Sequence, residues 1–177
     1  MSHNLTKLPH KLDADRATCR VMVETTKGRR SKLDYDKKSG VFRLKSLLPE
    51  GMSFPLDFGF VPSTSCDDGD PLDAMVLADE AIPTGTLLDV RLIGVIEAEE
   101  VEDGRTERND RLITVSCISR LYADLENIAD LEKRFTDNLI QFWTNKNHIE
   151  GKEFKCIGVR GPRQAIALIE KNTCGAK

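Results

Sequence analysis

Short apolar runs bounded by polar turns recur along this chain and predict β-strands. In residues 19–24, Val21 and Val23 share one face while Arg20 and Glu24 point to the other, which is the alternation of a half-buried strand. Further runs of strand-forming residues lie at 41–44, 74–78, 87–96, 112–118 and 154–159. The chain is therefore expected to be mainly β.

Helical spacing of apolar residues is confined to the later part of the chain. It predicts an amphipathic helix near 127–145 and a shorter one over 164–171. Many short strands followed by late helices indicate a closed or nearly closed β-barrel with the helices packed outside. A length of 177 residues suits a single domain over residues 1–177. Its aromatic and methionine residues are expected to be core rather than cofactor contacts.

Composition narrows the class of protein. With 40% hydrophobic and 31% charged residues, the chain resembles an ordinary globular protein, and no apolar stretch reaches the length of a membrane span. Five scattered cysteines and a polar N-terminus without an apolar signal core favour the cytoplasm. A net charge of −3 argues against a broad nucleic-acid surface. Neither a nucleic acid nor a membrane is expected as a partner.

The most informative local feature is an acidic turn. Asp68, Asp70 and Asp73 are separated only by Gly69, Pro71 and one leucine, so their like charges repel, and one or more must take up a proton or bind a cation. Mg²⁺ takes carboxylate oxygens and pairs with substrate phosphates. A solvated turn is the alternative, but the apolar run that follows places these carboxylates at the mouth of a core element. The spacing does not fit an EF-hand, which requires Gly at the sixth position and Glu at the twelfth.

A second polar pair lies on an earlier predicted strand. Lys32 and Asp34 share one face, which places a cation beside an anion that can bind a metal. A surface ion pair is the alternative interpretation, and the acidic turn favours the functional one.

These features resemble the soluble family I inorganic pyrophosphatases in order and spacing. Asp68-Gly69-Asp70-Pro71-Leu72-Asp73 with its following strand is similar to that family's signature. The segments at 21–36, 54–62, 94–96, 111–113 and the late helix ending at Lys146 follow in matching order. The resemblance implies a five-stranded OB-like barrel, Mg²⁺-dependent hydrolysis of pyrophosphate (with Mn²⁺ an alternative metal), and a homo-oligomer, in prokaryotic members a hexamer.

The resemblance also implies roles for single residues. Asp68 and Asp73 resemble metal ligands, with Asp73 bridging two metals, and Asp70 resembles the group that accepts a proton from the attacking water. Glu24 and Asp34 match acidic positions of the metal site. The positions that match substrate-binding cations are Lys32, Lys146 and, in the Asn109-Asp110-Arg111 segment, Arg111.

The chain departs from the family at several positions. The family's substrate arginine falls at Ser46, and strand alternation places the neighbouring Lys45 on the opposite face. Its tyrosines fall at Phe54, Phe58 and Asn145.

The Asn109-Asp110-Arg111 segment leaves its metal ligand open between two residues. Strict register puts Asn109 at a metal-ligand position, whereas a slip of one residue puts Asp110 there, and Asp110 is preferred because the chemistry needs its charge. Residues 99–111 are expected to form a long charged loop. Glu99, Glu100, Glu102 or Asp103 in this loop could supply another acidic ligand, and Arg105, Arg108 or Arg111 could replace the missing arginine.

Two other functions remain open at this point. A two-metal hydrolase of another small phosphoanhydride or phosphate ester would keep the acidic residues and change the substrate. A non-catalytic OB-like binding module would need a basic groove with stacking aromatics, which the acidic charge disfavours. The adjacent Phe142 and Trp143 suggest helix contacts on more than one side, in keeping with a hexamer.

Overall fold

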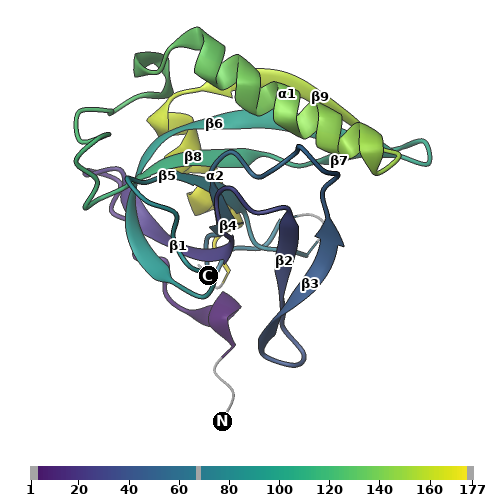
Figure 1. Cartoon of the computed structure of the whole chain (residues 1–177). Coiled ribbons are helices and arrows are strands. Elements are labelled where there is room, and N and C mark those ends of the chain that lie inside the picture. The colour runs from purple at the N-terminus through teal and green to yellow at the C-terminus, as the bar shows by residue number, and fades with distance from the viewer. Residues whose placement is uncertain (1–3, 67–68, 175–177) are drawn as a thin grey trace.

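Five strands close into a ring in the computed structural model, which describes residues 4–66 and 69–174 (Figure 1). Around the ring the order is β1, β4, β5, β8 and β6, and β6 pairs with β1 to close it. All neighbours are antiparallel except β5 and β8. The predicted five-stranded barrel is thereby confirmed. The ring strands are β1 Thr18–Thr25, β4 Asp57–Phe60, β5 Asp73–Leu77, β6 Leu87–Glu102 and β8 Arg111–Ser116.

Four further strands lie outside this ring. β7 (Arg105–Arg108) and β9 (Glu153–Arg160) both pair with β6, which is long enough to serve the ring and these two partners. β2 (Ser31–Asp36) and β3 (Val41–Leu47) form a separate hairpin that stands away from the ring (Figure 1).

The prediction of a loop over residues 99–111 is wrong, because these residues largely form the hairpin of β6 and β7. Asp103 and Gly104 both have positive φ at its tip, of 50° and 76°. Every residue of β7 is exposed, so no apolar alternation marks it as a strand. Backbone pairing of Glu99 through Glu102 with β7 orders this segment instead.

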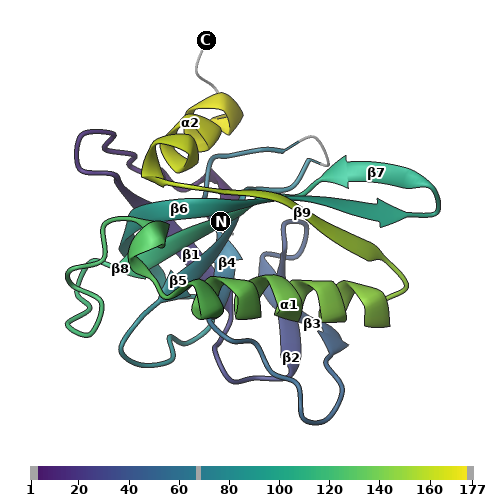
Figure 2. The same cartoon turned by 90° about the horizontal axis from the view of Figure 1, so that it is seen from above.

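Two α-helices, α1 (Lys133–Ile149) and α2 (Pro162–Asn172), lie on opposite sides of the sheet (Figure 2). The predicted bounds of 127–145 for the first helix are wrong at both ends. Asn127 caps a short 3-10 helix, η2 (Ile128–Asp130), through a capping box, and the chain is extended again at Leu131 before α1 begins. Another 3-10 helix, η1, spans Leu5–Lys7.

The wall of the ring is buried on both faces. On β5, Ala74 and Val76 pack in the cluster that includes α2, whereas Met75 and Leu77 pack in the cluster that includes Trp143 of α1. A strand covered on both sides reads as a continuous apolar run rather than an alternating one. This burial explains why residues 74–78 are uniformly apolar.

The aromatic side chains of α1 belong to the core of this chain. The Phe142 ring lies 5.4 Å from that of Phe54, and Trp143 lies 5.2 Å from Phe58. The prediction that these residues are core is confirmed. The expectation that adjacent Phe142 and Trp143 indicate contacts on a second side is not supported, because both rings pack within one aromatic cluster.

Within the described residues, no helix has both the length and the apolar character needed to cross a membrane.

Candidate active site

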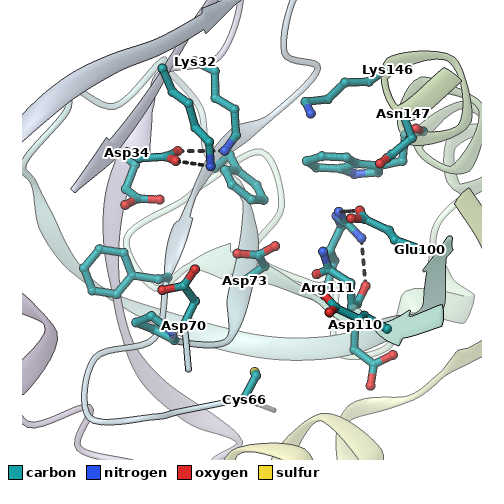
Figure 3. A pocket seen from close by; sticks show the side chains of 18 of the residues that line it. Lys32, Asp34, Cys66, Asp70, Asp73, Glu100, Asp110, Arg111, Lys146 and Asn147 are labelled. Atoms are coloured by element: carbon teal, nitrogen blue, oxygen red, sulfur yellow. Dashed lines mark hydrogen bonds and ion pairs between the residues drawn. The ribbon is translucent and has the colours of Figure 1, made fainter. Parts of the chain in front are cut away.

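A cavity of about 560 Å³ opens between the β2–β3 hairpin, the start of β5, the β6–β7 hairpin and the C-terminal half of α1. Asp34, Asp70 and Asp73 lie on one side of it, with Lys32 next to Asp34, and Arg111 and Lys146 lie on the other, with Glu100 and Asp110 near Arg111 (Figure 3). The first three and Glu24 are called the acidic wall, and Arg111 with Lys146 the cationic wall. Among the predicted residues that the structure describes, those that line the cavity are Glu24, Lys32, Asp34, Asp70, Asp73, Asp110, Arg111 and Lys146. Asp68, predicted as a metal ligand, lies outside the described residues.

The acidic wall is assembled by strand pairing across the ring. Met22 of β1 is opposite Phe60 of β4, which is opposite Asp73 of β5. Next along β4, a Cβ on Gly59 would lie 1.9 Å from the Met22 carbonyl oxygen, so only glycine allows the strands to approach this closely. Glu24 is the extra residue of the β-bulge that follows this contact, between Val23 and Thr25, and the charge of Asp73 acts on it there.

Glu24 is the most perturbed acid of this wall. Burial raises its pKa to about 8, the hydrogen bond from the Tyr35 N–H opposes the rise, and the charges of Asp34 and Asp73 add to it. Glu24 Oε1 accepts that bond at 2.8 Å, which ties β1 to β2. A carboxyl held protonated by burial and by neighbouring carboxylates becomes an anion once a cation offsets the repulsion.

The acidic wall fits a divalent cation in its chemistry, since hard cations take carboxylate oxygens. Among residues 4–66 and 69–174, no three metal-binding side chains come together closely enough to hold an ion. The predicted metal site also includes Asp68, which lies outside these ranges. The roles of Glu24, Asp34 and Asp73 as metal ligands therefore stay predictions, supported by the mutual repulsion of their charges.

Lys32 and Asp34 lie side by side, as predicted, with Lys32 Nζ 2.7 Å from Asp34 Oδ1. Lys45 Nζ contacts the other oxygen of Asp34 at 2.6 Å and lines the cavity. The expectation that Lys45 lies on the opposite strand face is wrong. A β-bulge is the reason: Lys32 is opposite Ser46, but Leu33 is opposite Leu44.

Asp70 stands at the mouth of the cavity in a hydrogen-bonded turn. Its carbonyl accepts from Cys66 N–H at 2.7 Å, and Gly69, with φ of 80°, donates to the Cys66 carbonyl at 2.9 Å. Its side chain is 72% exposed, and Lys37 Nζ lies 2.9 Å from Asp70 Oδ1. An exposed carboxylate is suited to exchange protons with water.

Arg111 dominates the cationic wall. Its guanidinium carbon lies 3.9 Å from the centre of the Trp143 ring, and Phe154 lies 5.1 Å away. It donates to the Asn109 carbonyl and to Glu100 Oε1, and its side chain is only 3% exposed. Its Nε has no hydrogen-bond partner within the described residues, which leaves one buried donor for an anion.

Lys146 shares the Trp143 platform, with its Nζ 5.7 Å from the ring centre. Burial lowers the pKa of Lys146, and the ion pair with Glu150 at 2.8 Å opposes that shift. Asn147 also lines the cavity and donates to the Trp143 carbonyl. Sequence reasoning missed Asn147, although its position one helical turn after Trp143 places both on one face of α1.

The two acids near Arg111 both have cationic partners. Asp110 Oδ1 accepts from Ala98 N–H at 3.0 Å and from Arg108 Nε at 2.6 Å. Burial raises the pKa of Glu100, but the charge and hydrogen bond of Arg111 hold that pKa below its usual value. The role of Asp110 as a metal ligand stays a prediction, and so does the replacement of the missing arginine by Arg108, which lines the cavity and pairs with Asp110 and Glu97.

A closed five-stranded barrel with a cavity of acidic and basic side chains at its edge defines an OB-like protein. The profile of the family described as inorganic pyrophosphatase matches residues 21–175. The chain is 34% identical over 169 residues to the inorganic pyrophosphatase of Helicobacter pylori, covering 95% of each chain. The chain therefore belongs to the inorganic pyrophosphatase family.

Solved structures agree with this assignment. The inorganic pyrophosphatase of Thermus thermophilus superposes with a TM-score of 0.86 at 26% identity, covering 97% of each chain. That of Helicobacter pylori gives a TM-score of 0.84 at 30% identity, covering 94% of this chain and 96% of the other.

Proposed function

We propose that this chain hydrolyses inorganic pyrophosphate to two phosphates with Mg²⁺ as its metal and Mn²⁺ as a substitute. The observation that carries the proposal is the division of one cavity into an acidic wall and a cationic wall. Pyrophosphate is a compact polyanion that needs both surfaces, because its hydrolysis requires neutralisation of charge and an in-line water.

The proposed metal ligands are Asp68, Asp73, Glu24, Asp34 and Asp110. When bound, the metal lowers the pKa of a coordinated water and neutralises phosphate charge. Glu24 is the residue whose protonation must change, because its raised pKa leaves it largely protonated near neutral pH in the free protein. Binding of a cation would displace that proton.

The remaining steps belong to the side chains of the cavity. Asp70, exposed at the mouth, accepts a proton from the attacking water through its carboxylate. Lys32, Arg111 and Lys146 hold phosphate oxygens. Because Arg111 and Lys146 are buried and stacked on Trp143, their charges act in a partly desolvated site where electrostatic stabilisation is strong.

Phosphate release by the purified protein tests this proposal. Pyrophosphate should be cleaved with Mg²⁺ or Mn²⁺, and far faster than nucleotides, polyphosphate or phosphate esters. A preference for one of those substrates would establish the alternative of a related hydrolase. Absence of release from every substrate, by protein that is folded by circular dichroism, would reject catalysis and leave a binding module.

A cytoplasmic location and a hexameric assembly accompany this proposal as predictions. Large apolar side chains that are exposed on the chain support assembly, and they lie on β3, on the segment after β8, at the end of α1 and on β9: Val41, Leu44, Leu47, Ile118, Leu121, Ile149, Ile157 and Val159.

A further inference from the structure

The β-bulge in β3 changes which side chains of that strand reach the cavity. Arg43 is directly opposite Asp34 in the β2–β3 pair, so alternation places Lys45, two residues later, on the same face as Asp34. The bulge at Lys45 turns Ser46 to that face as well, and both residues line the cavity, whereas Arg43 pairs with Asp36 at 3.5 Å and does not line it. The cavity therefore contains a lysine beside the position that matches the family's substrate arginine.

Two ammonium groups bracket a single carboxylate at this point. Lys32 Nζ lies 2.7 Å from Asp34 Oδ1, and Lys45 Nζ lies 2.6 Å from Asp34 Oδ2 (Figure 3). Because the two ammonium groups share one carboxylate, Lys45 can release its oxygen of Asp34 while Lys32 keeps the carboxylate paired.

The two lysines differ in their freedom to move. The Lys32 side chain is 15% exposed, whereas that of Lys45 is 61% exposed. An exposed ion pair is weak because water and salt screen it, so Lys45 can exchange one oxygen partner for another at little cost. Phosphate offers several oxygens that accept charge-assisted hydrogen bonds of the same kind.

We propose that Lys45 is a substrate-phosphate ligand that leaves Asp34 for a phosphate oxygen when pyrophosphate enters the cavity. This exchange uncovers Asp34 Oδ2 on the side of the acidic wall, so substrate binding and metal binding support each other. The proposal rests on the proposed function, because it concerns the same cavity and the same substrate.

Three variants test it. Lys45→Gln removes the charge, Lys45→Arg retains it, and Arg43→Gln is the matched control, since it removes a charge from the same strand outside the cavity. The measurements are KM and kcat for pyrophosphate at saturating Mg²⁺. A second measurement is the Kd for methylenediphosphonate, whose P–C–P bridge resists hydrolysis, from the fluorescence of the single tryptophan, Trp143, in the cavity wall.

Loss of one charge-assisted hydrogen bond should raise both KM and Kd about tenfold in Lys45→Gln, with kcat within about threefold of wild type. Lys45→Arg and Arg43→Gln should stay within about threefold of wild type in all three constants. Thermal melts are the folding control, and the exposure of Lys45 predicts no loss of fold.

Unchanged KM and Kd in Lys45→Gln would overturn the proposal, as would an equal effect in Arg43→Gln, which would indicate general electrostatics. A fall in kcat alone would assign Lys45 to positioning Asp34 instead. If wild-type protein binds the diphosphonate but cleaves no pyrophosphate, the proposed function fails while the Kd comparison still decides the role of Lys45. A wild type that neither cleaves pyrophosphate nor binds the diphosphonate overturns both.

Discussion

At the scale of single residues, burial and neighbouring charges decide the state of Glu24. Its carboxyl lies among other acids, and its pKa of about 8 exceeds the ordinary value of 4.5. Between these two pH values the folded chain holds a proton that the unfolded chain releases. Each rise in pH across that window therefore favours unfolding.

We expect the melting temperature of metal-free protein to fall between pH 5 and pH 8, because the stabilisation present below the ordinary pKa is lost as pH rises through about 8. Glu24→Gln, which keeps the size and cannot ionise, should show a clearly smaller fall. The exposed Glu80→Gln is the control and should follow wild type. Calorimetry in EDTA measures the three curves, and parallel curves for wild type and Glu24→Gln would refute the assignment.

Residue types and spacing predicted part of the site and not the rest. The adjacency of Lys32 and Asp34 followed from strand alternation and is confirmed. The position of Lys45 could not be predicted, because a bulge depends on pairing between strands and leaves no periodic signal. The contact of Asp110 with the Ala98 N–H of β6 could not be predicted for a similar reason, since it depends on a β6–β7 hairpin that no apolar pattern marks.

At the scale of elements, apolar runs predict most strands, whereas a strand made of exposed polar residues gives no such signal. β5 and β8 are buried along most of their length and were predicted from hydrophobicity alone. β7 is exposed throughout and was missed, because only its pairing with β6 makes it a strand. The start of α1 was misplaced because a capped 3-10 turn precedes it and continues its apolar spacing.

The close contact of β1 and β4 at Gly59 is the packing feature on which the acidic wall depends. Gly59→Ala would place a methyl group against backbone atoms of Met22 and Val23, at distances of 1.9 to 2.9 Å. Backbone cannot move aside as a side chain can, so we expect a loss of roughly 2–3 kcal/mol in the free energy of unfolding. Weaker Mg²⁺ binding should accompany it, because Glu24 would shift relative to Asp73.

Gly158→Ala is the matched control for this change. Its Cβ would meet the Glu97 carboxylate and the Arg160 guanidinium, which are the ends of flexible side chains. We expect a loss below about 1 kcal/mol, within the range of ordinary surface changes. Urea denaturation of both variants gives the comparison, and equal losses would show that the close approach of β1 and β4 is unimportant.

At the scale of the whole molecule, exposed apolar side chains on β3, β9 and the segment after β8 predict self-association. Light scattering coupled to size exclusion should give six times the chain mass of 19.8 kDa at micromolar concentration. Leu44→Glu, at a side chain outside the cavity, is expected to weaken assembly if β3 contributes to the interface. A wild-type mass equal to that of the single chain would exclude the hexamer.

The chemistry assigned to the cavity depends on two carboxylates that lie three residues apart in the chain. Asp70 is proposed to accept the proton of the attacking water, and Asp73 to hold the metal. Replacing each by asparagine preserves size while removing charge, so the two roles should separate in their dependence on Mg²⁺.

The decisive measurement is phosphate release from pyrophosphate across a Mg²⁺ titration for wild type, Asp70→Asn and Asp73→Asn, with thermal melts as folding controls. Asp70→Asn should lose about two orders of magnitude in turnover at saturating Mg²⁺. Its Mg²⁺ requirement should rise less than that of Asp73→Asn, which loses a charged metal ligand. Wild-type turnover by folded Asp70→Asn at saturating Mg²⁺ would contradict the catalytic role assigned to Asp70.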